Sequence, residues 1–140
     1  MVEGTTNTGE EYVADLLSST TVEVALISEQ LSNIQETDTL STLTEVGSSE
    51  YSRQQTTVSV QKQSGDYTLT NDSKLTWDVT GGTITVNSYL LLVNFTSDET
   101  GDSTSNWHIL APGSFNKSVD LSQGVDVIEV SSGSLGTKIN

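Results

Sequence analysis

The sequence contains no cysteine, one proline, one histidine and only five basic residues in 140 positions. Without cysteine, no disulfide can stabilise the fold. With a single histidine, any Ser-His-Asp triad or histidine-ligated metal site would have to use His108. The length is enough for one domain with one core, residues 1–140, and excludes a two-domain enzyme.

Basic residues are the most conspicuous shortage, because 19 Asp and Glu face 5 Lys and Arg and the formal net charge is −14. Nothing in the chain could neutralise a run of phosphates, so we expect no nucleic-acid partner. Charged residues are only 17% of the chain, so the acidity reflects missing bases rather than an acidic tract. Such a surface is typical of proteins that work in molar salt. The alternative is an ordinary acidic secreted domain.

Long apolar runs are also missing. The first residues, Met1 to Thr6, contain neither a basic region nor an apolar stretch, so we expect no secretory signal. No window approaches the roughly 20 apolar residues of a membrane span, so we expect no membrane partner.

Hydroxyl side chains dominate what is present, since 21 Ser and 21 Thr make up 42 of the 140 residues. Threonine favours strands and serine favours turns, and together with 11 Gly this composition predicts an all-β domain. Low hydrophobicity with high net charge is also the signature of disorder. Period-two apolar patterns and two tryptophans argue against disorder here.

These patterns predict about eight strands in a jelly-roll-like β-sandwich, with a small barrel as the alternative. The first strand, Val22–Ser28, is largely apolar and is expected at the centre of a sheet. A long loop, with a short helix or edge strand, is expected over 29–49. Gly81-Gly82 indicates a hairpin between the strands 74–80 and 83–95, and Asn87-Ser88 indicates a bulge. The remaining strands are expected at 55–63, 67–69, 107–111, 117–121, 125–130 and 135–139.

One short helix is predicted within an N-terminal arm, residues 1–20. Thr8 is a plausible N-cap, with Glu11 three residues later as in a capping box. The helix carries an apolar stripe that would either dock on a neighbouring subunit or pack on the chain's own sheet. The stripe consists of Tyr12, Val13, Leu16 and Leu17.

No catalytic residue, metal ligand or cofactor site is predicted. His108 alternates with apolar neighbours on a predicted strand, and no nucleophile-elbow motif is present. The acidic turn 98–102 lacks the spacing of a calcium loop. Three glycosylation sequons begin at Asn71, Asn94 and Asn116, and Asn94 is expected to be the least accessible.

Several segments occur in a distinctive order along the chain. They are Glu11-Tyr12-Val13-Ala14-Asp15-Leu16-Leu17, Val24-Ala25-Leu26, Glu45-Val46-Gly47, Tyr51-Ser52-Arg53-Gln54, Trp77, Gly82-Thr83-Ile84-Thr85-Val86, Gly124-Val125-Asp126-Val127 and Gly133-Ser134-Leu135. This layout resembles a family of small virion proteins of tailed viruses, often labelled tail-fibre-like. Members of that family carry a Tyr-Ala-Arg-Gln segment at the place of Tyr51-Ser52-Arg53-Gln54. With the salt-adapted charge, the resemblance implies a tailed virus of a halophilic archaeon.

The resemblance implies a non-enzymatic protein that is assembled into virions in the host cytoplasm. We expect a head decoration or vertex turret protein, associating as a homo-oligomer (trimer or pentamer) and with other virion proteins such as the major capsid protein. The residues expected at subunit contacts or in structural roles are Tyr12, Leu16, Leu17, Tyr51, Arg53 and Trp77. Arg53, the only arginine, is expected to form a bidentate carboxylate contact within the core rim or across a subunit boundary.

Three alternatives compete with this interpretation. A tail or tail-fibre component would contact the host through its polar loops. A secreted carbohydrate-binding module would need aromatic side chains on one exposed face, and Trp77 is predicted to point inward. A hydrolase would need His108.

Overall fold

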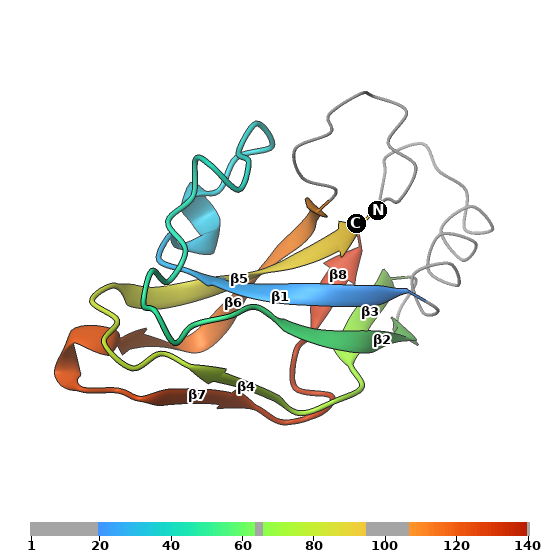
Figure 1. The fold of residues 1–140 in the computed structure, drawn as a ribbon. Coiled ribbons are helices and arrows are strands. Elements are labelled where there is room, and N and C mark those ends of the chain that lie inside the picture. Colours follow the sequence, from blue (N-terminus) through green and yellow to red (C-terminus); the bar gives the residue numbers. More distant parts are fainter. Residues whose placement is uncertain (1–19, 64–65, 95–106, 140) are drawn as a thin grey trace.

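The computed structural model describes residues 20–63, 66–94 and 107–139, and these form strands, loops and two short 3-10 helices (Figure 1). No α-helix occurs within those ranges. The helix predicted in the arm 1–20, with Tyr12, Leu16 and Leu17, lies outside the described residues, apart from Thr20. The eight strands are β1 Thr21–Ile27, β2 Gln54–Gln63, β3 Asp66–Asn71, β4 Leu75–Asp78, β5 Thr85–Asn94, β6 Trp107–Asp120, β7 Val127–Val130 and β8 Thr137–Ile139. The 3-10 helices are η1 Leu31–Asn33 and η2 Leu121–Gln123.

Six strands form one antiparallel sheet in the order β6-β5-β1-β2-β3-β8, and β4 pairs with β7 in a separate two-stranded sheet. The large sheet is strongly curled, so that its two edge strands, β6 and β8, contact each other. The β4–β7 ribbon runs along one side of the curled sheet (Figure 1). The predicted all-β class is therefore confirmed.

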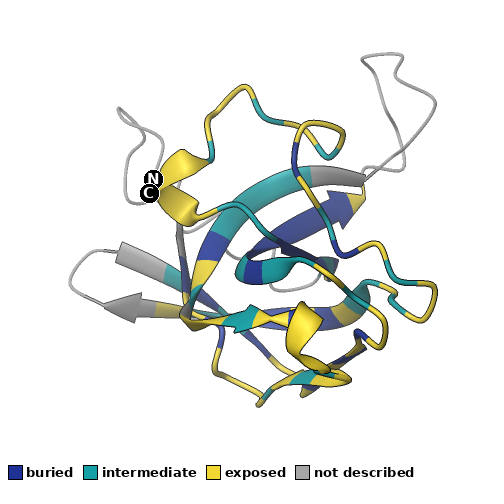
Figure 2. Cartoon of the chain, turned by 90° about the vertical axis from the view of Figure 1, so that its left-hand side faces the viewer, coloured by how far each residue is buried: buried dark blue, intermediate teal, exposed yellow. Residues whose placement is uncertain are grey.

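The main core fills the space between the concave face of the large sheet and the β4–β7 ribbon. Its members alternate along their strands, as period-two patterns require, and Figure 2 shows the buried positions concentrated on the strands. The largest fully buried side chain is Trp77 of β4, flanked on the same face by Leu75 and Val79. The inward pattern predicted for this strand is thus confirmed.

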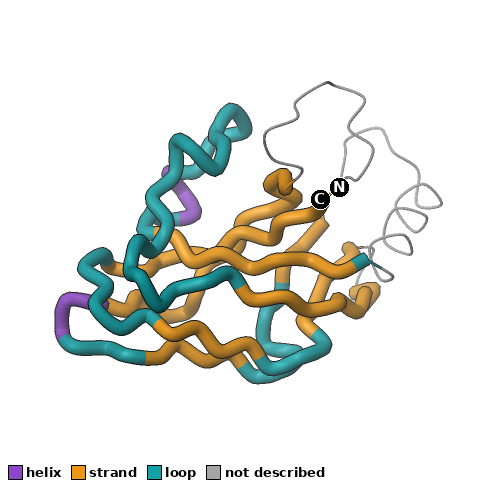
Figure 3. The backbone as a smooth tube through the Cα atoms, in the orientation of Figure 1, coloured by secondary structure: helices purple, strands orange, loops and turns teal. Residues whose placement is uncertain are grey.

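A second, smaller cluster lies on the opposite face of β1 and β5. Ala25, Ile27, Leu90 and Leu92 are buried there with Leu43 of the long loop between β1 and β2. That loop includes η1, and Figure 3 shows its long course between the two strands. Because the loop covers the outer face of the sheet at β1, this strand is buried on both faces. Burial on both faces explains its nearly continuous apolar sequence. The central position predicted for this strand is confirmed.

The hairpin predicted at Gly81-Gly82 is wrong, because β4 pairs with β7 and not with β5. The nitrogen of Gly82 does close a tight turn on the carbonyl of Val79, at 2.9 Å. The chain then leaves the ribbon and crosses to the large sheet. Gly82 packs so closely on Leu121 that a Cβ atom would lie 2.6 Å from its Cδ1, so the glycine serves a close approach.

Two further strand predictions need correction. The segments 107–111 and 117–121 form one strand, β6, which at 14 residues is longer than β5. The ladder between β5 and β6 shifts register between Val86 and Ser88, which confirms the predicted irregularity at Asn87-Ser88. Between these two pairs β6 has more residues than β5, so β6 bulges there. This bulge lies near the gap that the sequence predicted between the segments 107–111 and 117–121.

Candidate functional site

The site that unites the three predicted residues within the described ranges, Tyr51, Arg53 and Trp77, lies where β1 changes its hydrogen-bonding partner. β2 pairs with β1 as far as Val24, opposite Gln54. Beyond that point the loop takes over, with a bridge between Ile27 and Glu45. The loop nitrogen of Val46 donates to the carbonyl of Leu26 at 3.2 Å. The N–H of Leu26 lies between the part of β1 that pairs with β2 and the part that pairs with the loop.

Tyr51 satisfies this N–H with its side chain. The backbone nitrogen of Leu26 donates to the Tyr51 hydroxyl at 3.0 Å, and that hydroxyl donates to Glu45 Oε2 at 2.6 Å. Burial, and the hydrogen bond to Glu45, raise the pKa of Tyr51 well above its ordinary value. The phenol therefore stays neutral and can act as donor and acceptor at once.

Arg53 donates two hydrogen bonds from its guanidinium to the carboxylate of Glu45. Its Nε lies 2.9 Å from Glu45 Oε2, and its Nη2 lies 2.9 Å from Glu45 Oε1. Its Nη1 lies 3.8 Å from Glu23 Oε1 on β1, and Glu23 also accepts from Gln55 Nε2 at 3.0 Å. Hydrogen bonding to Glu45 raises the pKa of Arg53, so the charge is permanent. This is the bidentate contact expected of the only arginine, made within one chain.

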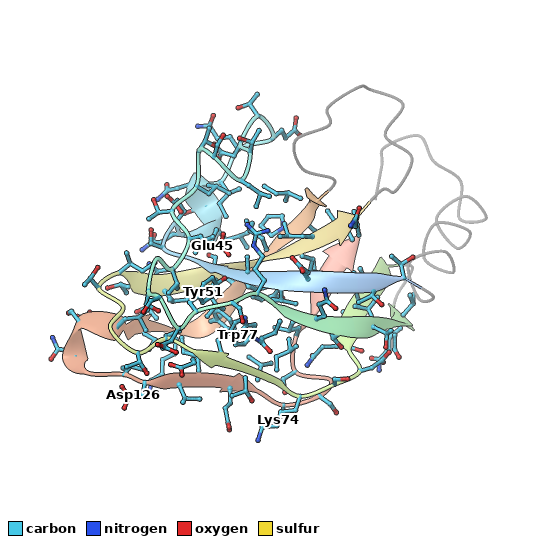
Figure 4. All side chains as sticks on the ribbon, viewed as in Figure 1. Glu45, Tyr51, Lys74, Trp77 and Asp126 are labelled. Carbon is cyan, nitrogen blue, oxygen red and sulfur yellow. The ribbon has the colours of Figure 1, made fainter. Side chains whose placement is uncertain are left out.

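Trp77 contacts β1 from inside the core. Its indole Nε1 donates to the carbonyl of Val24 at 3.1 Å, and the side chain is fully buried. Figure 4 shows Trp77 between the ribbon and β1, with Tyr51 and Glu45 at the loop side of the same strand. Tyr51, Arg53 and Trp77 thus all fix the central strand.

A shallow depression of about 490 Å³ lies over this cluster, lined by Glu23, Glu45, Val46, Gly47, Ser48, Tyr51, Ser52 and Arg53. The polar groups of Tyr51, Glu45 and Arg53 bond to one another or to backbone. Together these bonds hold the loop against the central strand.

Glu45 is the partner that sequence reasoning missed. Nineteen acidic residues compete for one arginine, and nothing local distinguishes Glu45 among them. The only signal was its place in the segment Glu45-Val46-Gly47, just before Tyr51.

The other predicted sites fall into two groups. The turn 98–102 lies outside the described residues, and so do the side chains of His108 and Asn116. Asn71 is 2% exposed, and its amide donates to the carbonyls of Ser73 and Ser131. Asn94 is exposed at the end of β5. The expectation that Asn94 is the least accessible sequon is wrong, since Asn71 is buried.

No cluster of three or more His, Asp or Glu side chains suited to a metal ion is found in the described ranges. No helix within those ranges is long and apolar enough to span a membrane.

Comparison of the chain with protein-family models, with curated proteins and with solved structures finds no match.

Proposed function

We propose that this protein is a non-enzymatic structural component of a tailed virus particle, a head decoration or vertex turret protein. The observation that carries the proposal is the role of the Tyr51-Ser52-Arg53-Gln54 segment. This segment carries the resemblance to small virion proteins, and its Tyr51 and Arg53 hold the long loop to the central strand through Glu45. Its polar groups stabilise the fold, which suits a structural protein that acts through contacts with other subunits.

The proposal includes the finer architecture. We regard the β4–β7 ribbon as the second layer of a small jelly-roll-like sandwich, with Trp77 packed between the layers. The partners on this proposal are other copies of the chain and the major capsid protein. A carbohydrate-binding module is less well supported, because Trp77 is fully buried and the Tyr51 hydroxyl is occupied.

Immunogold electron microscopy tests the proposal. An antibody against this chain is applied to purified virions of the virus that encodes it. Label on the heads is the expected result, and label confined to tails would replace it with a host-contacting tail component. Particles without label, when the same antibody detects the free protein, would remove the virion role. A hydrolase would need His108, so any hydrolytic activity that survives His108→Ala would remove that alternative.

A further inference from the structure

The β7 strand has one edge without a backbone partner among the described residues. The nitrogen of Val79 donates to the carbonyl of Asp126 at 2.8 Å, so the backbone groups of Asp126 point toward β4. Alternate residues of a strand point to the same edge. The backbone groups of Ile128 therefore face β4, opposite Trp77, while those of Val127 and Glu129 face away.

This edge also exposes apolar surface. Val127 is 49% exposed and is one of only two large hydrophobic side chains exposed in the described part of the chain. The side chains of Ile128 and Val130 point toward the core and are half-buried. An unpaired strand edge with exposed apolar residues is a template for another strand, and proteins usually block such edges with lysine, proline or a bulge. β7 contains no lysine, proline or bulge, and its one charged residue is the exposed Glu129.

We propose that β7 pairs antiparallel with β7 of a second copy of this chain, about a two-fold axis at Ile128. In this register Val127 of each copy faces Glu129 of the other and exchanges both backbone hydrogen bonds with it. The two Ile128 side chains then meet as a non-hydrogen-bonded pair, where side chains approach most closely. The ribbon becomes a four-stranded sheet across the dimer.

Charge and strand length select this register over its two neighbours. An axis at Glu129 would place two carboxylates directly opposite each other, which is destabilising. An axis at Val127 would bring Gly124 into the pairing, and Gly124 has a left-handed conformation at the end of η2. Only the axis at Ile128 keeps the pairing within extended residues and offsets the acidic side chains.

A second copy fits this edge better than an unrelated strand because the edge is complementary to itself. The apolar Val127 meets the aliphatic stem of Glu129, and Ile128 meets Ile128. Each chain carries a net charge of −14, so we expect the pairing to need molar salt. This two-fold contact is separate from any ring of three or five copies, and it does not depend on the virion location proposed above.

Sedimentation velocity in molar salt tests the inference. The wild-type chain is expected to double in mass with rising concentration. Val127→Pro removes an N–H that has no partner among the described residues, so the fold should persist while the dimer Kd rises at least about tenfold. Val127→Thr keeps the N–H and should still dimerise. Leu31→Thr removes the other exposed hydrophobic side chain and should change nothing.

Single cysteines define the register, since the chain has none of its own. Under mild oxidation, Ile128→Cys is expected to form a disulfide-linked dimer more readily than Val127→Cys or Glu129→Cys. A wild-type chain that stays monomeric at every concentration and salt would overturn the inference, as would an unchanged dimer in a folded Val127→Pro variant. Virion labelling is a separate readout, so either proposal can fail alone.

Discussion

The hydroxyl of Tyr51 accepts a hydrogen bond from the backbone nitrogen of Leu26 at 3.0 Å, where β2 has left β1 and the loop has just joined it. A side chain here replaces a strand neighbour. Buried backbone groups must find a partner, and the phenol also connects the strand to Glu45 and so to Arg53.

Removing this hydroxyl tests its structural role. Tyr51→Phe leaves the N–H of Leu26 without its partner and removes one of the two donors to Glu45 Oε2, and we expect the free energy of unfolding to fall by about 1–3 kcal/mol. Denaturant unfolding monitored by tryptophan fluorescence measures this change. Ser48→Ala is the matched control, because the buried Ser48 hydroxyl lines the same depression without a hydrogen bond. Equal stability of the two variants would contradict the role given to Tyr51.

Replacing Arg53 by lysine should lower the free energy of unfolding, because the bidentate contact with Glu45 is lost. Arg53→Lys keeps the charge but has no paired donors at fixed spacing, so we expect it to lose about 1–2 kcal/mol in the same assay. Lys74→Ala breaks an exposed ion pair with Glu129, whose atoms lie 3.4 Å apart, and should have little effect. A lysine variant as stable as wild type would show that the fork geometry is unimportant.

Gly113 should reject even a methyl group. A Cβ atom at this position would lie 2.2 Å from Cζ of Tyr89, whose ring also packs on Phe115. We expect Gly113→Ala to lower the thermal midpoint by several degrees, because Tyr89 must move and disturb its 2.8 Å contact with Thr137. Gly47→Ala meets no atom within 4 Å and serves as the control. Matching midpoints for the two variants would contradict the packing of Tyr89 over Gly113.

Alkaline pH should weaken the fold. The pKa of Tyr51 is raised in the folded state, whereas in the unfolded chain it returns to its ordinary value near 10.0. Above that pH the unfolded state binds fewer protons than the folded state. The contribution of Tyr51 to the free energy of unfolding is therefore fully present below pH 10 and declines as the pH rises further. Unfolding midpoints between pH 8 and 12 should fall more steeply for wild type than for Tyr51→Phe. Parallel slopes would show that Tyr51 does not contribute.

Salt should strengthen the fold. The charge of −14 repels itself unless counterions screen it, so we expect the free energy of unfolding to rise steeply between low and molar sodium chloride. Thermal scans across that range measure the effect. A flat dependence would count against adaptation to high salt.

Burial patterns were the part of the fold that the sequence predicted well. Leu75 and Trp77 in β4 follow an alternation that records which side faces the core, and the nearly continuous apolar run of β1 indicated a central strand. The strand partners were harder, because pairing depends on residues far apart in the chain. Nothing local indicates that Trp77 faces Ile128 rather than a residue of β5.

The candidate site was predicted in its side chains but not in its connections. Tyr51, Arg53 and Trp77 were identified by type and position, but their partners were not. Tyr51 and Trp77 bond to the backbone of Leu26 and Val24, and Arg53 bonds to the carboxylate of Glu45. A gap between two successive partners of one strand exists only after the chain has folded. No sequence pattern encodes it directly.

The central place of β1 also bears on how the chain folds. β1 precedes both of its neighbours in the sequence, and these neighbours, β2 and β5, end at Gln63 and Asn94. During synthesis, the apolar segment from Val24 to Ile27 therefore lacks its β5 partner until β5 has been made, although the loop and β2 can pair with its other edge earlier. Such a segment is prone to pair with other copies, and closing such distant contacts is slow. We therefore expect a nascent chain of this protein to be prone to mispairing at β1 until β5 has emerged.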